Sequence, residues 1–469
     1  MEGGLSMAVW SVVNNSLVNH HSGRIDAEYY KTESLQAYDY VKKGNYKLLG
    51  QLAKEGYRVV YENTKILNPE KVDEQQDVRF LQATNVSDDG LWIESKEIGF
   101  VSGKDWVKYP KGRIKHGELL IEVKGQAEKV TIVQDYMPMR TLVTGTLYKL
   151  TVDEKLVSPE YIFAYFSCKY GKILRDRTKV NTLISYVSKP ELYNIPIPIF
   201  EESIDEITSI VRESYRLSIL AHSFYHQAEE LLAKELQLDQ LKLPNKRWYT
   251  ADYCEVMGKR RFDGEYFQPK YKQIEMHIKA YKKGYSVIKE LFYENKSVST
   301  LSKDKYKYIE IGDINNSDGT YAYNTIEKRD LPASAKIELS QGDVLISTVR
   351  PYRGAVSIIY DSFSDLIGSS AFTVVREKNG YKKEVLQVLL RLDCYKELLM
   401  KWNVGTSYPI IKNNDVMNLV IPMIPENIQI KISELVQQSF FAKQKSGLLL
   451  TQAKYYVEEL IEQEANKYK

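Results

Sequence analysis

Two long stretches of the chain have the hydrophobic periodicity of helices. Residues 201–241 contain no Pro and no Gly, and apolar or small residues recur there at alternating steps of three and four. Residues 425–469 repeat this rhythm. Such steps are the heptad pattern of a coiled-coil seam. The pattern predicts long helices over 200–241 and 425–469, each about 60 Å long at about 1.5 Å per residue.

The seam positions also predict how the two helices pair. Small residues such as Ser214 and Ser446 lie at the seam centres and would let two backbones approach closely. A helix with an apolar stripe must bury that stripe, and we expect the two helices to form an antiparallel coiled coil. The alternative is that each helix packs separately on its own domain. The predicted pairing residues are Ile207, Val211, Ser214, Ala221, Ala228, Ile432, Val436, Ser439, Ser446 and Ala453.

Short apolar runs predict strands outside these helices. Turn signals such as Asp89-Gly90 and Gln341-Gly342 separate the runs, and such dipeptides favour turns. The predicted strands are 80–83, 118–121, 143–150, 308–311, 344–347 and 371–375, and the shorter predicted helices are 159–174 and 383–401. The predicted fold class is α+β, with two tandem α+β domains separated by the two long helices.

The two α+β parts repeat each other in sequence. The first carries Arg24-Ile25-Asp26-Ala27-Glu28-Tyr29-Tyr30, and 237 residues later stands Arg261-Phe262-Asp263-Gly264-Glu265-Tyr266-Phe267. Residues 117–121 match 342–346 at an offset of 225, and 182–198 match 406–422 at an offset of 224. Ordered matches at nearly one offset indicate a tandem duplication with a pseudo-twofold relation. The predicted divisions are domains 1–199 and 242–424 and helical spacers 200–241 and 425–469.

The composition is that of a folded protein in a reducing setting. Of 469 residues, 43% are hydrophobic and 27% are charged, which is ordinary for a globular chain. Three cysteines are too few for a disulfide framework, which favours a cytoplasmic location. No apolar run approaches the roughly 20 residues of a membrane-spanning helix. We therefore expect no membrane partner.

The net charge is only +3, but the basic residues are unevenly distributed. Residues 242–424 carry a net charge of +7, whereas residues 200–241 hold three bases and nine acids. Bases interleaved with aromatic and hydroxyl side chains suit contacts to phosphates and base edges. The alternative for any single cluster is a solvated basic surface. The candidate DNA-contact residues are Lys104, Lys108, Lys111, Arg113, Lys115, Lys124, Arg140, Arg175, Arg177, Lys179, Arg350, Tyr352, Arg353, Lys401, Thr406 and Ser407.

Motifs for catalysis are missing from the sequence. There is no Gly-x-x-x-x-Gly-Lys-Ser/Thr phosphate loop and no Gly-x-Gly-x-x-Gly after a strand. The three cysteines and six histidines have no zinc-site spacing. Glu122-Val123-Lys124 with Asp105 upstream is a weak match to a metal-dependent nuclease, and the second copy keeps neither the acid nor the lysine. We predict no catalytic residues, no metal ligands and no cofactor bound by this chain.

The sequence resembles the specificity (S) subunit of Type I restriction-modification systems over essentially its whole length. The resemblance rests on Trp10 before the motif at 24–30, on the turn and strand Gly342–Ser347, and on Ile195-Pro196-Ile197-Pro198 and Leu419-Val420-Ile421-Pro422 leading into the long helices. The helix segment 227–232 also fits. The first copy departs from the usual Gly-Asp turn, with Glu118 after Gly117.

The resemblance implies a non-catalytic subunit of a methyltransferase and endonuclease complex. Residues 1–199 and 242–424 would be target recognition domains, each reading half of a split site in double-stranded DNA. The helices would set the gap between the half-sites. Two methyltransferase (M) subunits would dock on the chain and bring S-adenosylmethionine, and restriction (R) subunits could join. The alternatives are the DNA-recognition part of a methyltransferase–nuclease enzyme and a coiled-coil scaffold protein without DNA binding.

Overall fold

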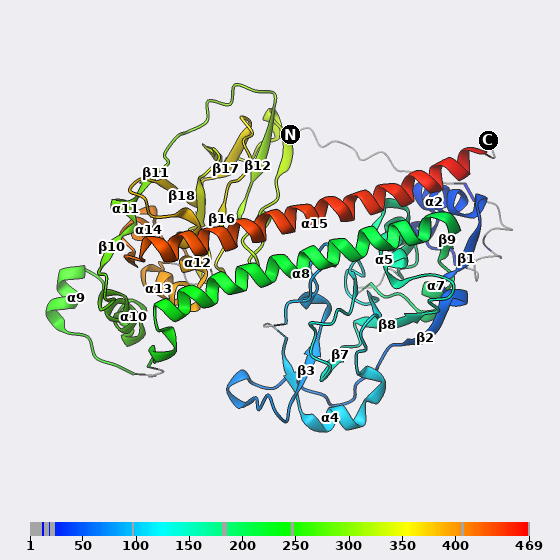
Figure 1. The fold of residues 1–469 in the computed structure, drawn as a ribbon, viewed down its shortest axis with the longest axis horizontal. Helices are drawn as coiled ribbons and strands as arrows, with labels where there is room; N and C mark the ends of the chain where they lie inside the picture. The colour runs from blue at the N-terminus through cyan, green and yellow to red at the C-terminus, as the bar shows by residue number, and fades with distance from the viewer. Residues whose placement is uncertain are drawn as a thin grey trace. The chain divides into compact units, whose positions relative to one another are not determined.

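The computed structural model describes residues 12–13, 18, 24–95, 98–180, 185–244, 248–404 and 408–467. The chain divides into two compact units. Unit 1 comprises Met1–Ile219 and Lys443–Lys469, and unit 2 comprises Leu220–Ala442. The helices α8 (Ile204–Glu235) and α15 (Glu426–Lys467) each contribute one part to unit 1 and the other part to unit 2 (Figure 1).

Unit 1 contains a four-stranded sheet and a three-stranded sheet. The larger sheet is antiparallel with the order β2-β8-β5-β6, and the smaller has the order β4-β3-β7 with β3 and β7 parallel. Strands β5 and β6 are buried along their whole length, which fits their apolar sequences. The strands are β2 (Ala53–Tyr57), β3 (Val78–Leu81), β4 (Phe100–Val101), β5 (Leu119–Glu122), β6 (Val130–Ile132), β7 (Thr141–Val143) and β8 (Leu147–Val152).

Unit 2 has the same plan with one more strand. Its antiparallel sheet has the order β11-β18-β15-β16, and its second sheet has the order β13-β12-β17-β14 with β12 and β17 parallel. The strands are β11 (Phe292–Glu294), β12 (Lys305–Ile309), β13 (Asn324–Glu327), β14 (Ala335–Glu338), β15 (Val344–Ser347), β16 (Val356–Ile358), β17 (Leu366–Ser369) and β18 (Phe372–Glu377). The predicted α+β class is confirmed.

A short antiparallel ladder lies before the long helix in each unit. In unit 1, β1 (Tyr46–Leu48) pairs with β9 (Pro196–Pro198), and in unit 2, β10 (Tyr285–Val287) pairs with β19 (Val420–Pro422). The remaining α-helices are α2 (Thr32–Lys43), α3 (Leu49–Leu52), α4 (Gly103–Lys108), α5 (Pro159–Ser167), α6 (Lys169–Arg177), α7 (Lys189–Tyr193), α9 (Tyr253–Lys259), α10 (Pro269–Lys279), α11 (Ile288–Leu291), α12 (Lys383–Arg391), α13 (Asp393–Leu399) and α14 (Asn413–Met417).

The two shorter helices predicted from sequence are each broken in two. The predicted helix 159–174 is α5 followed by α6, because Cys168 has an extended backbone with ψ of 168°. The predicted helix 383–401 is α12 followed by α13, because Leu392 is extended with ψ of 143°. The hydrophobic pattern continues through both breaks, so periodicity alone did not reveal them.

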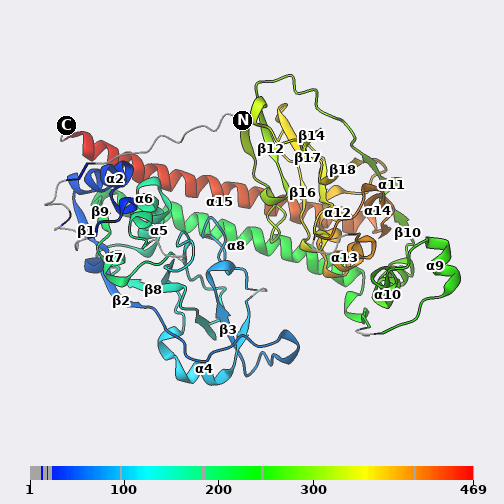
Figure 2. The same ribbon diagram turned by 180° about the vertical axis from the view of Figure 1, so that it is seen from behind.

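The long helices pair antiparallel within each unit (Figures 1 and 2). In unit 1, Ser214 Oγ donates to the carbonyl of Ser446 at 2.8 Å and Ser446 Oγ donates to the carbonyl of Ser214 at 2.7 Å. The hydroxyl of Tyr456 donates to Glu206 at 2.9 Å. Tyr456 lies ten residues after Ser446 in α15, whereas Glu206 lies eight residues before Ser214 in α8. The contacts therefore run in opposite directions along the two helices.

Unit 2 repeats the serine contact, since Ser439 Oγ donates to the carbonyl of Ala221 at 2.7 Å. Ser214 and Ser439 are 225 residues apart, and so are Ala221 and Ser446. All ten predicted pairing residues are buried. In unit 1, Ile207, Val211 and Ala453 also join the domain core, so the helices pack on the domain as well as on each other. The corresponding core of unit 2 includes Ala228, Ile432 and Val436.

Candidate nucleic-acid interface

A repeated arginine–aspartate clamp holds one loop in each unit. Arg24 Nε lies 2.8 Å from Asp26, and its Nη2 donates to the carbonyl of Lys179 at 2.8 Å. In unit 2, Arg261 Nε lies 2.8 Å from Asp263, and its Nη2 donates to the carbonyl of Asn403 at 3.0 Å. The motif at 24–30 and its copy at 261–267 thus bind equivalent backbone carbonyls, those of Lys179 and Asn403.

The charge state of each clamp follows from these contacts. Burial is the largest single effect on Asp26 and opposes its ionisation, but the hydrogen bond and charge of Arg24 together with backbone amides outweigh it, and the pKa of Asp26 is lowered. The hydrogen bond from Arg261 is the main cause that lowers the pKa of Asp263. Both clamps are therefore ionised at neutral pH.

In each unit, the segment that follows the clamped carbonyl hydrogen-bonds to a β-hairpin. We call residues 123–129, between β5 and β6, the unit 1 hairpin loop, and residues 348–355, between β15 and β16, the unit 2 hairpin loop. The amide of Gly125 donates to Ser185 at 3.1 Å, and the amide of Arg350 donates to Pro409 at 2.7 Å. Gly125 and Arg350 are 225 residues apart, so the two loop pairs are equivalent.

The unit 2 hairpin loop carries two arginines, of which Arg353 is exposed and Arg350 is half-buried. The guanidinium of Arg350 lies 4.6 Å from the ring centre of Tyr408, which is itself exposed. Tyr352 and Arg353 are also exposed. Across the ranges that the structure describes, neither arginine side chain makes a hydrogen bond or an ion pair. This loop therefore offers cationic donors that are available to an anionic or base-edge ligand.

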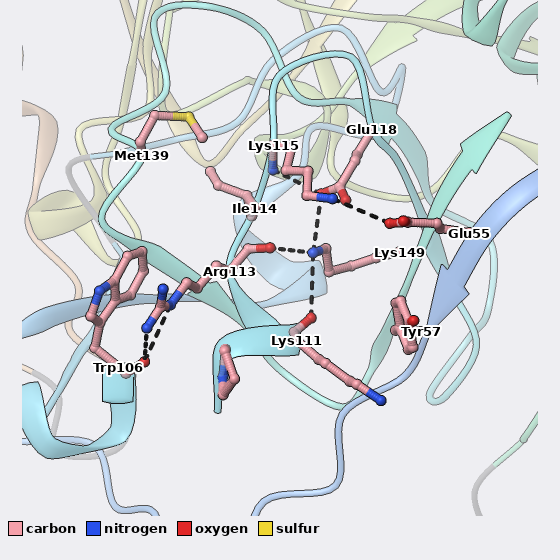
Figure 3. A pocket seen from close by; sticks show the side chains of 11 residues that line it. Glu55, Tyr57, Trp106, Lys111, Arg113, Ile114, Lys115, Glu118, Met139 and Lys149 are labelled. Atoms are coloured by element: carbon pink, nitrogen blue, oxygen red, sulfur yellow. Dashed lines mark hydrogen bonds and ion pairs between the residues drawn. The ribbon is translucent and has the colours of Figure 1, made fainter. Parts of the chain in front are cut away.

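In unit 1 three of the predicted bases line one pocket of about 490 Å³ (Figure 3). Lys111 lies 4.8 Å from the ring centre of Tyr57, and Arg113 lies 4.4 Å from that of Trp106. Lys115 is exposed and forms a 3.2 Å ion pair with Glu55. The pocket thus combines cations with aromatic faces, the side chains that contact phosphates and stack on bases.

Other predicted bases surround this pocket. Arg140 lies 5.8 Å from the ring of Trp106 and donates to the carbonyl of Gln76 at 2.6 Å. Lys104 and Lys108 are exposed on α4. Lys124 is exposed in the unit 1 hairpin loop. Of these residues, Arg140 lies beside the pocket residue Trp106, whereas Lys104, Lys108 and Lys124 do not line the pocket.

The floor of the pocket is a buried ion pair that the sequence prediction missed. Lys149 Nζ lies 3.2 Å from Glu118, and both side chains are about 95% buried. The same ammonium donates to the carbonyls of Lys111 and Arg113, and Glu118 accepts the amide of Lys115 at 2.8 Å. Burial lowers the pKa of Lys149. The pair fixes the backbone that carries all three pocket bases.

The structure buries two of the predicted DNA-contact residues. Arg175 and Arg177 are each only 5% exposed. Arg175 donates to the carbonyls of Glu128 and Phe166 at 2.9 and 3.1 Å, and burial lowers its pKa to about 10. Arg177 donates to the carbonyl of Tyr29 at 3.0 Å and stacks on that ring. Both arginines satisfy buried carbonyls instead of facing solvent.

Two more predicted contacts are held by acids. Lys179 pairs with Asp176 at 2.6 Å, and Lys401 pairs with Glu275 at 2.6 Å. Their side chains are 13% and 15% exposed, so neither is free to reach a ligand without breaking its pair. Thr406 and Ser407, along with Trp10, lie outside the described residues.

Within the described ranges, no three His, Cys, Asp or Glu side chains meet as a group that could hold a metal ion. In the same part of the chain, no helix combines the length and the apolar composition needed to cross a membrane.

Solved structures of type I restriction-modification systems are similar to this chain. The S subunit from M. genitalium is 12% identical, with a TM-score of 0.41, over 90% of this chain and 95% of that one. The HsdS subunit from Thermoanaerobacter tengcongensis is 13% identical, with a TM-score of 0.27, over 88% of this chain and 95% of that one. A chain from a structure on complex assembly and conformational transition of the type I R-M system is 12% identical, with a TM-score of 0.28, over 90% and 97%. No family model and no curated protein matches the sequence.

Proposed function

We propose that this chain is the specificity subunit of a type I restriction-modification complex and that each unit reads one half of a split DNA site. The observation that carries the proposal is the pair of equivalent loop assemblies, one in each unit. Each assembly joins an arginine–aspartate clamp to a hairpin loop through equivalent backbone hydrogen bonds. A protein that reads two half-sites needs two such surfaces, each on its own scaffold.

The cations around the loop assemblies suit two kinds of DNA contact. Lys111 and Lys115 at the unit 1 pocket are point charges on flexible stems, which suit phosphates. Arg350 and Arg353 in unit 2 are unpaired within the described residues and carry planar guanidiniums, which suit guanine edges. The proposal therefore assigns base reading and backbone contact to different side chains.

The paired helices α8 and α15 would set the gap between the half-sites and bind the methyltransferase subunits, two in number. S-adenosylmethionine would be bound by those subunits, and restriction subunits could join the complex. The chain itself would have no catalytic role. Its three cysteines are free thiols, which suits a reducing, cytoplasmic setting.

The test is to express the chain together with its candidate methyltransferase subunit in a host without its own adenine methylation and to sequence the modified bases. We expect methylation at one motif made of two short half-sites with a fixed unspecified gap. Omitting this chain while keeping the methyltransferase should abolish the methylation. Methylation at an uninterrupted motif, or methylation that persists without the chain, would contradict the proposal.

A further inference from the structure

One position in the two hairpin loops has a positive φ in both units and very different residues. Gly125 in unit 1 has φ of +109°, and Arg350 in unit 2 has φ of +50°. Both amides donate to the equivalent carbonyl of the neighbouring loop, at Ser185 and Pro409. The following contact is also equivalent, since Val187 donates to Val123 at 2.9 Å and Ile411 donates to Thr348 at 2.9 Å. The scaffold therefore requires a left-handed residue at this point in both units.

Glycine adopts this conformation without strain, whereas arginine does not. A side chain in the left-handed region costs about 1–2 kcal/mol, because Cβ approaches the following carbonyl. Pro351 adds to the cost, since the residue before a proline favours extended backbone. Unit 1 meets the requirement with glycine, but unit 2 keeps Arg350 despite the strain. Strained residues of this kind cluster at functional sites.

Among the described residues, no hydrogen bond or ion pair of the Arg350 side chain offsets this cost. Its guanidinium stacks on Tyr408 at 4.6 Å from the ring centre, and Tyr408 is 60% exposed. Stacking contacts one face of the half-buried guanidinium and does not use its N–H groups. Within the described part of unit 2, no acceptor binds that edge. A planar guanidinium fixed in this way matches the two acceptors on the major-groove edge of guanine.

We propose that Arg350 is a specificity-determining residue that reads one guanine in the half-site bound by unit 2, and that Gly125 leaves unit 1 without a reader at the equivalent place. The inference rests on the proposed function, because it needs a DNA half-site at unit 2. It goes further by naming the residue, the base and the reason why the two half-sites are read differently.

The experiment compares Arg350→Gly, Arg350→Lys and the charge control Lys283→Ala, which removes an exposed lysine from a turn of the same unit. Each full-length chain, assembled with its methyltransferase subunits, is titrated against duplexes carrying the wild-type motif and every single-base change in both half-sites. Thermal unfolding of each chain is measured in parallel.

We expect Arg350→Gly to lose about 5- to 150-fold of discrimination at one guanine of one half-site, equivalent to about 1–3 kcal/mol. Its unfolding midpoint should stay unchanged or rise, because glycine relieves the strained backbone. Arg350→Lys should lose the same discrimination while it keeps most of its overall affinity, since lysine retains the charge without the planar fork. Lys283→Ala should change neither discrimination nor stability.

Three results would overturn the inference. Unchanged discrimination in Arg350→Gly would show that this side chain reads no base. Equal weakening on every duplex, with lysine restoring the affinity, would show a phosphate contact. Relaxation of both half-sites with a lower unfolding midpoint would show a structural role. A wild-type complex that has no split-site preference at all would contradict the proposed function itself, and that result is distinct from these three.

Discussion

Glu118 in unit 1 and Asp343 in unit 2 occupy the same turn before the central strand, and their surroundings differ. Each carboxylate accepts the backbone amide three residues earlier, from Lys115 at 2.8 Å and from Ser340 at 2.9 Å. Glu118 then pairs with buried Lys149. Asp343, which is fully buried, pairs instead with the half-exposed Arg376 at 2.8 Å. Both units have the same turn, but the cation that pairs with its carboxylate is different in each.

The change of cation is linked to a change of the neighbouring segment. At the strand position of Lys149, unit 2 has the buried Val374. Unit 2 builds strand β14, and at the corresponding place the described residues of unit 1 form a single bridge between Arg113 and Leu142. In unit 1, the ammonium of Lys149 donates hydrogen bonds to the carbonyls of Lys111 and Arg113 in this segment. In unit 1, hydrogen bonds from a buried lysine thus hold a segment that unit 2 holds by strand pairing. That segment is a loop that carries Lys111, Arg113 and Lys115. The comparison suggests how one scaffold can present two different surfaces.

The largest effect should come from breaking the unit 1 pair. Lys149→Met keeps the volume of the side chain but leaves Glu118 buried without its cation. We expect a loss of about 3 kcal/mol in the free energy of unfolding, because an uncompensated buried charge is costly. Denaturant unfolding of the full chain measures it. Adding Glu118→Gln to Lys149→Met should recover most of the loss, and a double variant as unstable as the single one would contradict this account.

Removing the acid of the unit 2 pair should cost less. Asp343→Ala removes the acceptor of the Ser340 amide and the partner of Arg376, but the half-exposed guanidinium can turn to water. We expect a loss of about 1–3 kcal/mol, the cost of leaving buried donors unsatisfied. The same denaturant unfolding gives the value. If Asp343→Ala proved more destabilising than Lys149→Met, the contrast between a buried and an exposed cation would be wrong.

The loops themselves should differ in how they contact DNA. Lys111→Gln in unit 1 should weaken binding by a similar factor on every duplex and reduce the salt dependence by about one released counterion. This differs from the change at a single base expected for Arg350. Binding measured at several salt concentrations, on matched and mismatched duplexes, separates the two. A base-specific loss in Lys111→Gln would show that the unit 1 pocket reads sequence.

The clamps should behave alike in both units and have the smallest effect. The pKa values of Asp26 and Asp263 are lowered in the folded chain, so between the folded value and the unfolded value near 3.9 the unfolded chain binds more protons. Their contribution is complete above that range and is lost as the pH falls through the folded pKa. Asp26→Asn and Asp263→Asn should each make stability slightly less dependent on pH as the pH falls below about 5. Unfolding measured across this range tests it, and opposite responses of the two variants would break the equivalence of the clamps.

The sequence predicted those features of the fold that repeat along the chain. Heptad steps placed the helices over 200–241 and 425–469, and the structure has them at Ile204–Glu235 and Glu426–Lys467. The motif match at 24–30 and 261–267 identified the two equivalent segments, and the structure shows that each one forms a clamp. Periodicity and repetition can be recognised in a single sequence, because neither depends on knowing the tertiary contacts.

The candidate site was less predictable, because it depends on tertiary partners. Arg175 and Arg177 look like a basic cluster in the sequence, but they face carbonyls that other segments bring to them. Lys149 was missed although it is a lone lysine in the apolar strand Leu147–Val152, which is a usable signal of a buried ion pair. The left-handed backbone of Arg350 has no signature in the sequence beyond its alignment with Gly125.

The most direct test of two units reading one split site is to lengthen the paired helices and sequence the methylated DNA. Seven residues are inserted between Ile219 and Leu220 in α8 and seven between Ala442 and Lys443 in α15, which preserves the heptad seam. We predict unchanged half-sites and a gap longer by about three base pairs, since seven residues add about 10 Å and each base pair spans about 3.4 Å. An active variant with an unchanged gap, or with altered half-site sequences, would contradict the account.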